Sequence, residues 1–231
     1  SIRHAGREAA LFLAFALLKY SKLKQGAFMA DVLILYYSRN GSVGKLADLI
    51  ARGVEEGGAT ARLRCVPAVS PNHMATEAAV PDDGAPYVSK QDLSECSAVI
   101  VGSPTRFGNM AAPMKHFWDS TGAEWASGTL VGKPAAVFTS TATMHGGQES
   151  TLLSMMLPLL HHGCVIVGIP FTEPRLSSTQ TGGTPYGASH VSGADGKAAF
   201  SEDEKVLAKA LGRRVAQISL TITARSRACA C

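Results

Sequence analysis

Small polar residues follow the first apolar run of the chain, where a helical pattern begins. The segment comprises Ser38, Arg39, Asn40, Gly41, Ser42 and Val43. Hydroxyl groups, a glycine and the free N–H groups of a helix start bind a phosphate without a formal positive charge, because the helix dipole supplies a partial one. The segment therefore predicts a site for a phosphomonoester, although an ordinary strand-to-helix turn has a similar composition.

The two better-known phosphate loops do not fit this segment. A Walker A loop would need a glycine at Arg39 and a serine or threonine at Leu46. The Gly41-x-x-Gly44 pair lacks the leading glycine of the G-x-G-x-x-G motif. Both a nucleoside triphosphatase and a Rossmann dehydrogenase are therefore disfavoured.

Two further segments rich in small and hydroxyl residues follow later apolar runs. One comprises Pro104, Thr105, Arg106, Phe107, Gly108 and Asn109, and the other Ser140, Thr141, Ala142, Thr143, Met144 and His145. Pro104 stiffens the backbone and Gly108 permits close approach, so N–H groups can face a planar polar ring that Phe107 and Met110 cover. Each segment alone has the composition of a capped loop, but three at successive strand ends predict a single pocket.

The elements that must position these segments alternate along the chain. Short apolar runs at 32–37, 63–66, 98–101, 135–138 and 164–167 predict buried strands. Helical spacing predicts helices over 43–54, from Pro113 to about 119, and over 149–160, where Pro158 should bend or end the helix early. A capping box from Ser201 to Glu204 opens a last amphipathic helix. The segment 173–199 reads as a long ordered excursion.

Alternating strands and helices with continuous apolar strands predict an α/β fold, a doubly wound five-stranded parallel sheet with helices on both faces. In such sheets a ligand lies beyond the carboxyl ends of the strands, at the switch point of strand order. The three polar segments occupy this edge.

Composition narrows the class of protein. The 231 residues are 46% hydrophobic and 17% charged, which suits one domain with a large core. The net charge of +4 is scattered without a basic run, so nucleic-acid binding is disfavoured. The odd count of 5 cysteines is typical of the cytoplasm, and Cys229 and Cys231 lack the second ligand pair that a metal site needs.

The two ends of the chain differ from the rest. The apolar run 9–18 is too short to span a bilayer, so integral membrane association is not expected. Lysines after this run count against a signal peptide. We interpret residues 1–28 as an extension outside the fold, 29–222 as one domain and 223–231 as a flexible tail.

Several motifs resemble those of WrbA proteins in order and spacing, from residue 29 to about residue 218. They are Tyr36-Tyr37-Ser38 with Gly41, the segment 104–109, Trp125-Ala126-Ser127-Gly128, Gly146-Gly147-Gln148-Glu149, His161-His162-Gly163 and the segment 182–188. Such an ordered set is highly specific. The resemblance implies a flavodoxin-like fold, FMN as cofactor, and NAD(P)H:quinone oxidoreductase activity that reduces quinones to hydroquinones by two electrons.

The resemblance also implies roles for individual residues. The segment 38–43 would hold the FMN phosphate, with the ring between 104–109 and 140–145. His161 matches a flavin-site position, although a helix-end histidine bonded to backbone carbonyls is the alternative. Trp125 and Asn40 fall on the substrate side, and Asn40 replaces an aromatic residue of some relatives that can stack on the dinucleotide. Arg106 either stabilises negative charge on the reduced ring or pairs with a nearby carboxylate.

FMN would carry the chemistry, so the sequence singles out no certain catalytic side chain beyond the candidates Arg106 and His161. The resemblance further implies a homotetramer whose sites are completed at subunit interfaces. At Met144 and His145 the chain departs from the glycines of the shortest relatives. Neither the physiological quinone nor the choice between NADH and NADPH follows from the sequence.

Two alternative functions stay open at this point. One is a flavodoxin-type electron carrier or a flavin-bound interaction scaffold with little turnover. Carriers are normally negative to meet redox partners, so a net charge of +4 favours the enzyme. The other is an azoreductase or NADPH-dependent FMN reductase, which would share the segment 38–43 but lack the segments 104–109 and 182–188.

Overall fold

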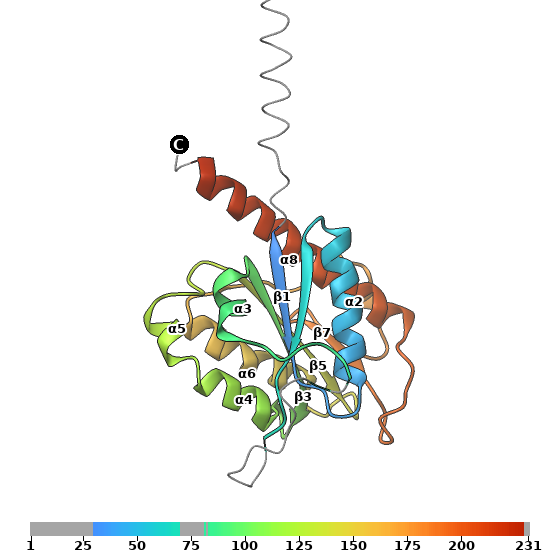
Figure 1. Cartoon of the computed structure of the whole chain (residues 1–231). Coiled ribbons are helices and arrows are strands. Elements are labelled where there is room, and N and C mark those ends of the chain that lie inside the picture. Colours follow the sequence, from blue (N-terminus) through green and yellow to red (C-terminus); the bar gives the residue numbers. More distant parts are fainter. Residues whose placement is uncertain (1–29, 70–80, 82, 229–231) are drawn as a thin grey trace, which may run out of the picture.

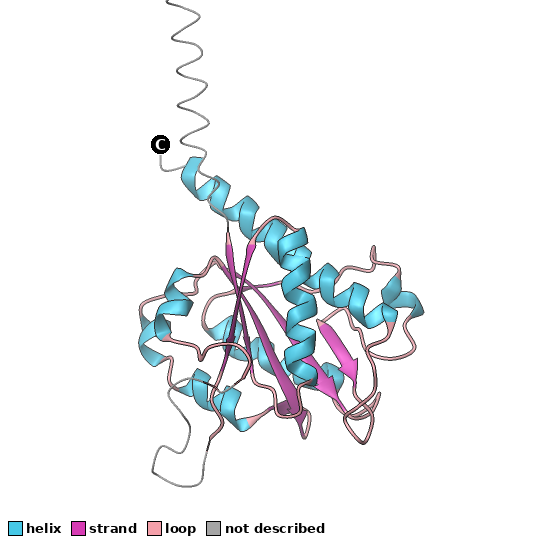
Figure 2. Ribbon diagram, turned by 45° about the vertical axis from the view of Figure 1, so that its right-hand side comes forward, coloured by secondary structure: helices cyan, strands magenta, loops and turns pink. Residues whose placement is uncertain are grey.

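The computed structural model describes residues 30–69, 81 and 83–228 as a parallel sheet between two layers of helices (Figures 1 and 2). The strand order is β2 (Thr60–Cys65), β1 (Asp31–Tyr36), β3 (Ala98–Arg106), β5 (Pro134–Thr141) and β6 (Val165–Ile166). Neighbours along this path are all parallel. The predicted flavodoxin-like, doubly wound order of five strands is confirmed.

The edge position beside β5 is divided between two short strands. β6 pairs with the first two residues of β5, whereas β7 (Ala188–Val191) pairs in parallel with its last four. The chain between them carries α7 (Arg175–Ser178). The sequence predicts an excursion here but not β7, because the buried polar residues Ser189 and His190 interrupt any apolar run.

Two strands continue past their apolar runs into the predicted site segments. β3 extends to Arg106 and β5 to Thr141, with Pro104 opposite Ser140. The description of these residues as loops was therefore wrong. Buried hydroxyls replace apolar side chains here, and Thr139 Oγ1 donates to the Ser103 carbonyl at 2.8 Å. β4 (Asn109–Met110) then folds back antiparallel onto β3.

Helices cover each face of the sheet and enclose two apolar cores (Figure 1). α2 (Ser42–Glu56) and α8 (Glu202–Ala228) lie together on one face. The other face carries α3 (Lys90–Glu95), α4 (Ala112–Asp119), α5 (Gly122–Ala126) and α6 (Gln148–His161). Val43, Leu46 and Ile50 of α2 are buried as their spacing predicts.

Two helix ends differ from expectation. α6 does not end at Pro158 but continues to His161, because a proline near the last turn removes only one N–H donor and the His162 N–H still reaches the Pro158 carbonyl at 3.0 Å. α8 begins at the predicted capping box and runs to Ala228, so residues 223–228 are helical rather than a tail.

The predicted extension 1–28 and the last residues 229–231 lie outside the described residues. Within the part that the structure describes, no helix is both long and apolar enough to cross a membrane.

Candidate functional site

The start of α2 is built to accept an anion. Its N-cap is Gly41, with a φ of 86°, and no side chain caps the first turn. A Cβ at Gly41 would meet nothing within 4 Å, so the space in front of the helix is open. The Gly44 N–H reaches Ser38 Oγ at 3.3 Å, which fixes the loop from β1. The first N–H groups and the positive end of the helix dipole therefore face a free volume.

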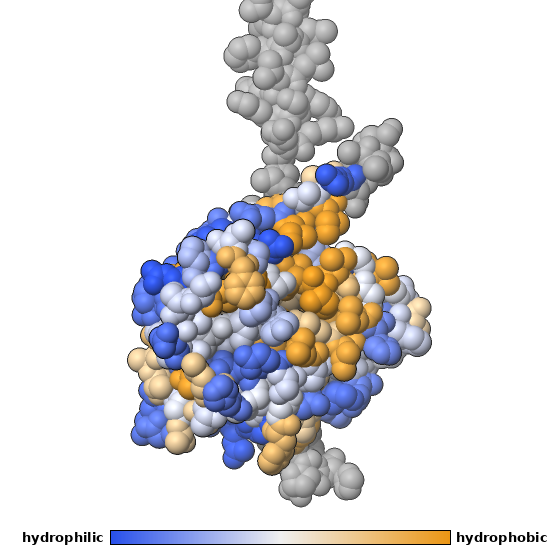
Figure 3. All heavy atoms as spheres, turned by 180° about the vertical axis from the view of Figure 1, so that it is seen from behind, coloured by the Kyte–Doolittle hydropathy of each residue, from blue (hydrophilic) through white to orange (hydrophobic). Residues whose placement is uncertain are grey.

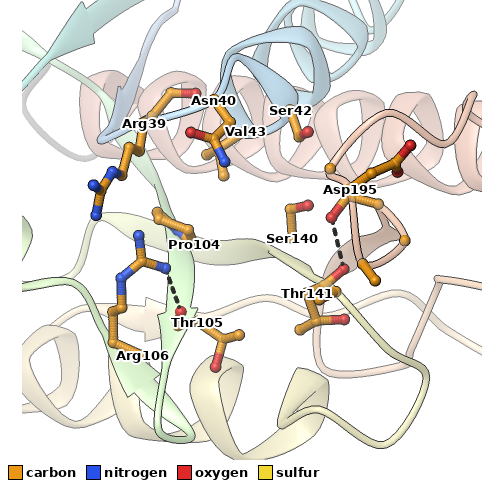
Figure 4. A pocket seen from close by; sticks show the side chains of 16 residues that line it. Arg39, Asn40, Ser42, Val43, Pro104, Thr105, Arg106, Ser140, Thr141 and Asp195 are labelled. Carbon is orange, nitrogen blue, oxygen red and sulfur yellow. Dashed lines mark hydrogen bonds between the residues drawn. The ribbon is translucent and has the colours of Figure 1, made fainter.

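A pocket of about 230 Å³ lies at this point, beyond the carboxyl ends of β1, β3, β5 and β7 (Figure 4). We call it the site pocket. The predicted residues that line it are Ser38, Arg39, Asn40, Ser42, Val43, Pro104, Thr105, Arg106, Ser140, Thr141 and Ala142. The structure thus brings together the three polar segments that the sequence analysis assigned to a single pocket.

One wall of the site pocket was not foreseen. The segment 192–196, which follows β7, contributes Ser192, Gly193, Ala194, Asp195 and Gly196. The Ser192 Oγ and N–H both donate to the Thr141 carbonyl, at 3.0 and 2.8 Å, which joins this wall to β5. The glycines of this segment are the sequence feature that could have indicated a site here. Because β7 was not predicted, the sequence pattern did not place them at the edge of the sheet.

A second cavity, of about 540 Å³, adjoins the site pocket and shares Arg39 and Arg106 with it. We call it the side hollow. Its other walls include Tyr37, Asn109 and Met110, so it combines a flat aromatic face with apolar and amide groups. Such a mixture suits a planar ring with polar edges.

The tip of the β3–β4 hairpin lies away from both cavities. Phe107, with a φ of 53°, is fully exposed, and it lines neither the site pocket nor the side hollow. A Cβ at Gly108 would come within 2.9 Å of Ser150 Oγ, so this glycine allows close packing on α6. Phe107 therefore does not join the residues that line the two cavities of its own chain, while Met110 does line the side hollow.

The later part of the third polar segment also points elsewhere. Thr143, Met144 and His145 line neither cavity. Instead, the Met144 carbonyl accepts a 2.9 Å hydrogen bond from Gln148 Nε2. Arg106 makes no ion pair among the described residues, and its Nη1 donates to the Thr105 carbonyl at 2.7 Å. No carboxylate among the described residues therefore forms the structural salt bridge that was the alternative role of Arg106.

Trp125 and His161 lie together, but in a different cavity of about 310 Å³ formed by α4, α5 and the end of α6. We call it the tryptophan hollow. Its neighbouring histidine, His162, is buried and shares a 2.9 Å hydrogen bond with Thr121 Oγ1. Burial lowers the pKa of His162 below its ordinary value of 6.5.

The tryptophan hollow is remote from the site pocket of the same chain. α6 starts beside the β3–β4 hairpin, since a Cβ at Gly147 would lie 3.0 Å from Gly108 Cα, and it ends at His161. A helix of this length spans about 20 Å. His161 therefore does not join the residues that line the site pocket of its own chain.

The donor set of the site pocket fits the phosphate and sugar-like chain of a mononucleotide. It offers an uncapped helix start and the hydroxyls of Ser38, Ser42 and Ser140, without a carboxylate at the helix start. The Thr141 hydroxyl donates to the Thr143 carbonyl at 2.8 Å. The adjoining side hollow offers room for a flat ring. Among the described residues, no group of three His, Cys, Asp or Glu side chains is arranged to hold a metal ion.

Fold and pocket together define a flavodoxin-like protein with a site for a mononucleotide. The model of the family described as NADPH-dependent FMN reductase matches residues 31–172. The chain belongs to this family.

Curated relatives are similar over their whole length. The chain is 46% identical over 200 residues to an NAD(P)H dehydrogenase (quinone) of Gluconacetobacter diazotrophicus, covering 85% of this chain and 100% of the relative. It is 44% identical over 199 residues to the protein of the same description in Rhizobium rhizogenes, with coverage of 85% and 100%. The relationship that the WrbA-type motifs predicted is thereby confirmed at the level of the family.

Solved structures agree on the fold. A WrbA-like flavodoxin of Agrobacterium tumefaciens superposes with a TM-score of 0.61 at 20% identity, covering 83% of this chain and 98% of that one. An archaeal flavodoxin gives a TM-score of 0.54 at 18% identity, with coverage of 82% and 98%. At these identities the match supports the flavodoxin-like architecture alone.

Proposed function

We propose that this protein is an FMN-dependent NAD(P)H dehydrogenase that reduces quinones by two electrons. The observation that carries the proposal is the uncapped start of α2 at Gly41, which lies across a pocket from Ser140 and Thr141 at the sheet's switch point. Relatives named NAD(P)H dehydrogenase (quinone) match this chain over 98–100% of their length. The geometry supplies the cofactor site and the relatives supply the reaction class.

FMN, when bound, supplies two-electron redox chemistry between a nicotinamide and a quinone. The residues of this chain bind and orient it. The N–H groups after Gly41 and the hydroxyl of Ser42 would hold the phosphate, and Asp195 and Asn40 would offer polar groups to the hydroxylated chain. Tyr37 and Met110 line the side hollow and would cover one side of a ring that entered it.

We further propose a homotetramer in which the tryptophan hollow of one chain faces the site pocket of another. Trp125 and His161 line neither the site pocket nor the side hollow of their own chain, so a second copy would be what brings them to a flavin. The outer face of α6 is apolar at helical spacing, with Leu153, Leu157 and Leu160 all exposed. Figure 3 shows apolar side chains gathered on the face of the molecule opposite to that of Figure 1.

Cytoplasmic location is part of the same proposal. Cys65, Cys96 and Cys164 are all free thiols in the structure, which suits a reducing compartment that also supplies NADH and NADPH.

Purification and kinetics test the proposal directly. The protein should be yellow, retain FMN, and oxidise NADH or NADPH only when benzoquinone is added. Light scattering coupled to gel filtration should give four times the chain mass of 24.1 kDa. Bound FMN without quinone-dependent turnover would instead favour a carrier or scaffold, and a colourless protein that refuses FMN would contradict the site itself.

A further inference from the structure

Two arginine side chains converge at one side of the site pocket. Figure 4 shows the guanidinium of Arg39, from the loop after β1, and that of Arg106, at the end of β3, pointing toward one another. Both residues also line the side hollow, and so does Lys115 of α4, whose ammonium group pairs with Asp119. The hydrogen bond from Arg106 Nη1 to the Thr105 carbonyl, at 2.7 Å, holds one of the two guanidiniums in place.

These two arginines have no carboxylate partner among the described residues although both line a cavity, whereas the unpaired Arg52 and Arg214 are exposed and line neither the site pocket nor the side hollow. Arg62, Arg64, Arg175 and Arg213 each form an ion pair with an aspartate or glutamate. Arg39 and Arg106 form none within the described residues, and no acidic side chain lines the side hollow there. Like charges that face each other repel, so the arrangement favours an anion between them.

The position of the pair separates it from the phosphate site at the start of α2. In Figure 4 the two guanidiniums lie on the far side of Pro104 from Ser42, Ser140 and Thr141. FMN has one phosphate, and the neutral cradle at Gly41 and Ser42 already suits it. A second, cationic site beside the same pocket therefore calls for a second ligand that carries its own negative charge.

We infer that Arg39 and Arg106 bind the phosphate groups of the NAD(P)H co-substrate. The inference rests on the proposed function, because it assigns a residue pair to one of the two substrates of that reaction. Guanidinium groups bind phosphate oxygens through paired N–H donors, and two of them on opposite sides clamp one phosphate group or a diphosphate. The diphosphate occurs in both dinucleotides, and the 2′-phosphate only in NADPH.

Calorimetric titration of the FMN-loaded protein with NAD⁺ and NADP⁺ tests the assignment without turnover, since neither reduces the flavin. Arg39→Gln should weaken binding about tenfold, the loss of one charge-assisted hydrogen-bonded contact. An equal loss of affinity for NAD⁺ and NADP⁺ would assign Arg39 to the diphosphate. A loss of affinity confined to NADP⁺ would assign it to the 2′-phosphate. Arg39→Lys should recover part of the affinity.

Arg52→Gln is the matched control, because Arg52 is an exposed arginine of α2 that lines neither the site pocket nor the side hollow. It should change dinucleotide affinity less than twofold. Equal weakening by Arg52→Gln would reduce the effect to general charge and overturn the inference. So would an Arg39→Gln protein that loses FMN affinity yet binds both dinucleotides as the wild type does. FMN retention and quinone turnover of the wild type, measured on the same preparation, report separately on the proposed function.

Discussion

The indole Nε1 of Trp125 donates a 2.9 Å hydrogen bond to the carbonyl oxygen of His161. This bond joins α5 to the end of α6, while 57% of Trp125 remains exposed. Backbone atoms of the tryptophan hollow therefore position the indole, and no residue of the site pocket takes part. Effects on a substrate and effects on the flavin should consequently be separable at this side chain.

Replacing Trp125 by alanine should raise the KM for benzoquinone more than it weakens FMN retention. Loss of an aromatic face that stacks on the quinone should cost about three- to tenfold in KM. The FMN dissociation constant should change less than twofold, because Trp125 does not line the site pocket of its own chain. Steady-state kinetics on FMN-loaded protein and FMN titration of the apoprotein measure the two effects.

Trp125→Phe provides the control for this prediction. It keeps an aromatic face but removes the Nε1 donor to His161, so it should retain most of the quinone affinity. If Trp125→Ala lost FMN and activity to the same extent, the assignment of Trp125 to quinone binding would be wrong.

Two glycines at opposite ends of α2 allow an effect on the phosphate site to be separated from an effect on helix stability. Gly41 precedes the helix with a φ of 86°, and Gly58 follows it with a φ of 88°. Alanine at either position should lower the free energy of unfolding by about 1 kcal/mol, the cost of a left-handed backbone for an L-residue. Only Gly41→Ala should also weaken FMN binding, by several-fold, because only Gly41 orients the N–H groups at the pocket.

Quenching of FMN fluorescence gives the affinity, and urea denaturation gives the stability of both variants. Gly58→Ala should bind FMN like the wild type, since a Cβ there would meet only Leu220 Cδ1, at 3.7 Å. If the two variants lost FMN affinity to the same extent, the effect would reflect stability alone and the cradle at Gly41 would lose its support.

Much of the sheet follows from the sequence because its central strands are apolar on both faces. Leu33, Ile34 and Leu35 have no exposed surface, as a strand covered by two helical layers requires. β7 could not be found in this way. Its polar residues are satisfied by distant groups: Ser189 Oγ accepts from the Gly183 N–H at 2.7 Å, and His190 Nδ1 lies 3.0 Å from Glu204 Oε2.

The sequence predicted those residues of the site that directly follow a strand. The three segments that meet in the site pocket each follow a predicted strand, so the switch-point rule places them together. Phe107 also follows a predicted strand but does not line the site pocket. The chain turns back into β4 within two residues, which leaves Phe107 at a hairpin tip. The separation of His161 from the pocket depends on the direction and full length of α6, which Pro158 obscured.

Glu204 is a buried carboxylate whose removal should destabilise the fold. It accepts hydrogen bonds from the N–H groups of Gly182, Val191 and Ser201 and faces His190 Nδ1, all within 2.9–3.0 Å. Glu204→Gln should lower the free energy of unfolding by about 3 kcal/mol, because the amide NH₂ would face a donor. The exposed Glu202→Gln should change it by about 0.5 kcal/mol or less, as urea denaturation would show. A small effect at Glu204 would mean that water replaces these bonds.

The same carboxylate should make stability fall in acid. Burial alone would raise the pKa of Glu204, but hydrogen bonds from His190, Val191 and Ser201 outweigh it and hold the pKa below the ordinary 4.5. A carboxyl group with a lowered pKa in the folded state stabilises the fold fully above its unfolded pKa and loses that contribution as the pH falls through the folded value. The difference in unfolding free energy between wild type and Glu204→Gln should therefore narrow between pH 7 and pH 3. A difference independent of pH would show that Glu204 is not the titrating group.

The contact between α2 and α8 rests on two reciprocal glycines. A Cβ at Gly53 would lie 2.1 Å from the Lys209 carbonyl oxygen, and a Cβ at Gly212 would lie 2.1 Å from the Ile50 carbonyl oxygen. Gly53→Ala should therefore lower the free energy of unfolding by about 2 kcal/mol or more, although alanine is the better helix former by about 1 kcal/mol. Gly122→Ala in α5, where a Cβ meets nothing within 4 Å, should be neutral or slightly stabilising. Urea denaturation of both variants decides the matter: a Gly53→Ala protein as stable as Gly122→Ala would mean that the two helix backbones are farther apart than the structure places them.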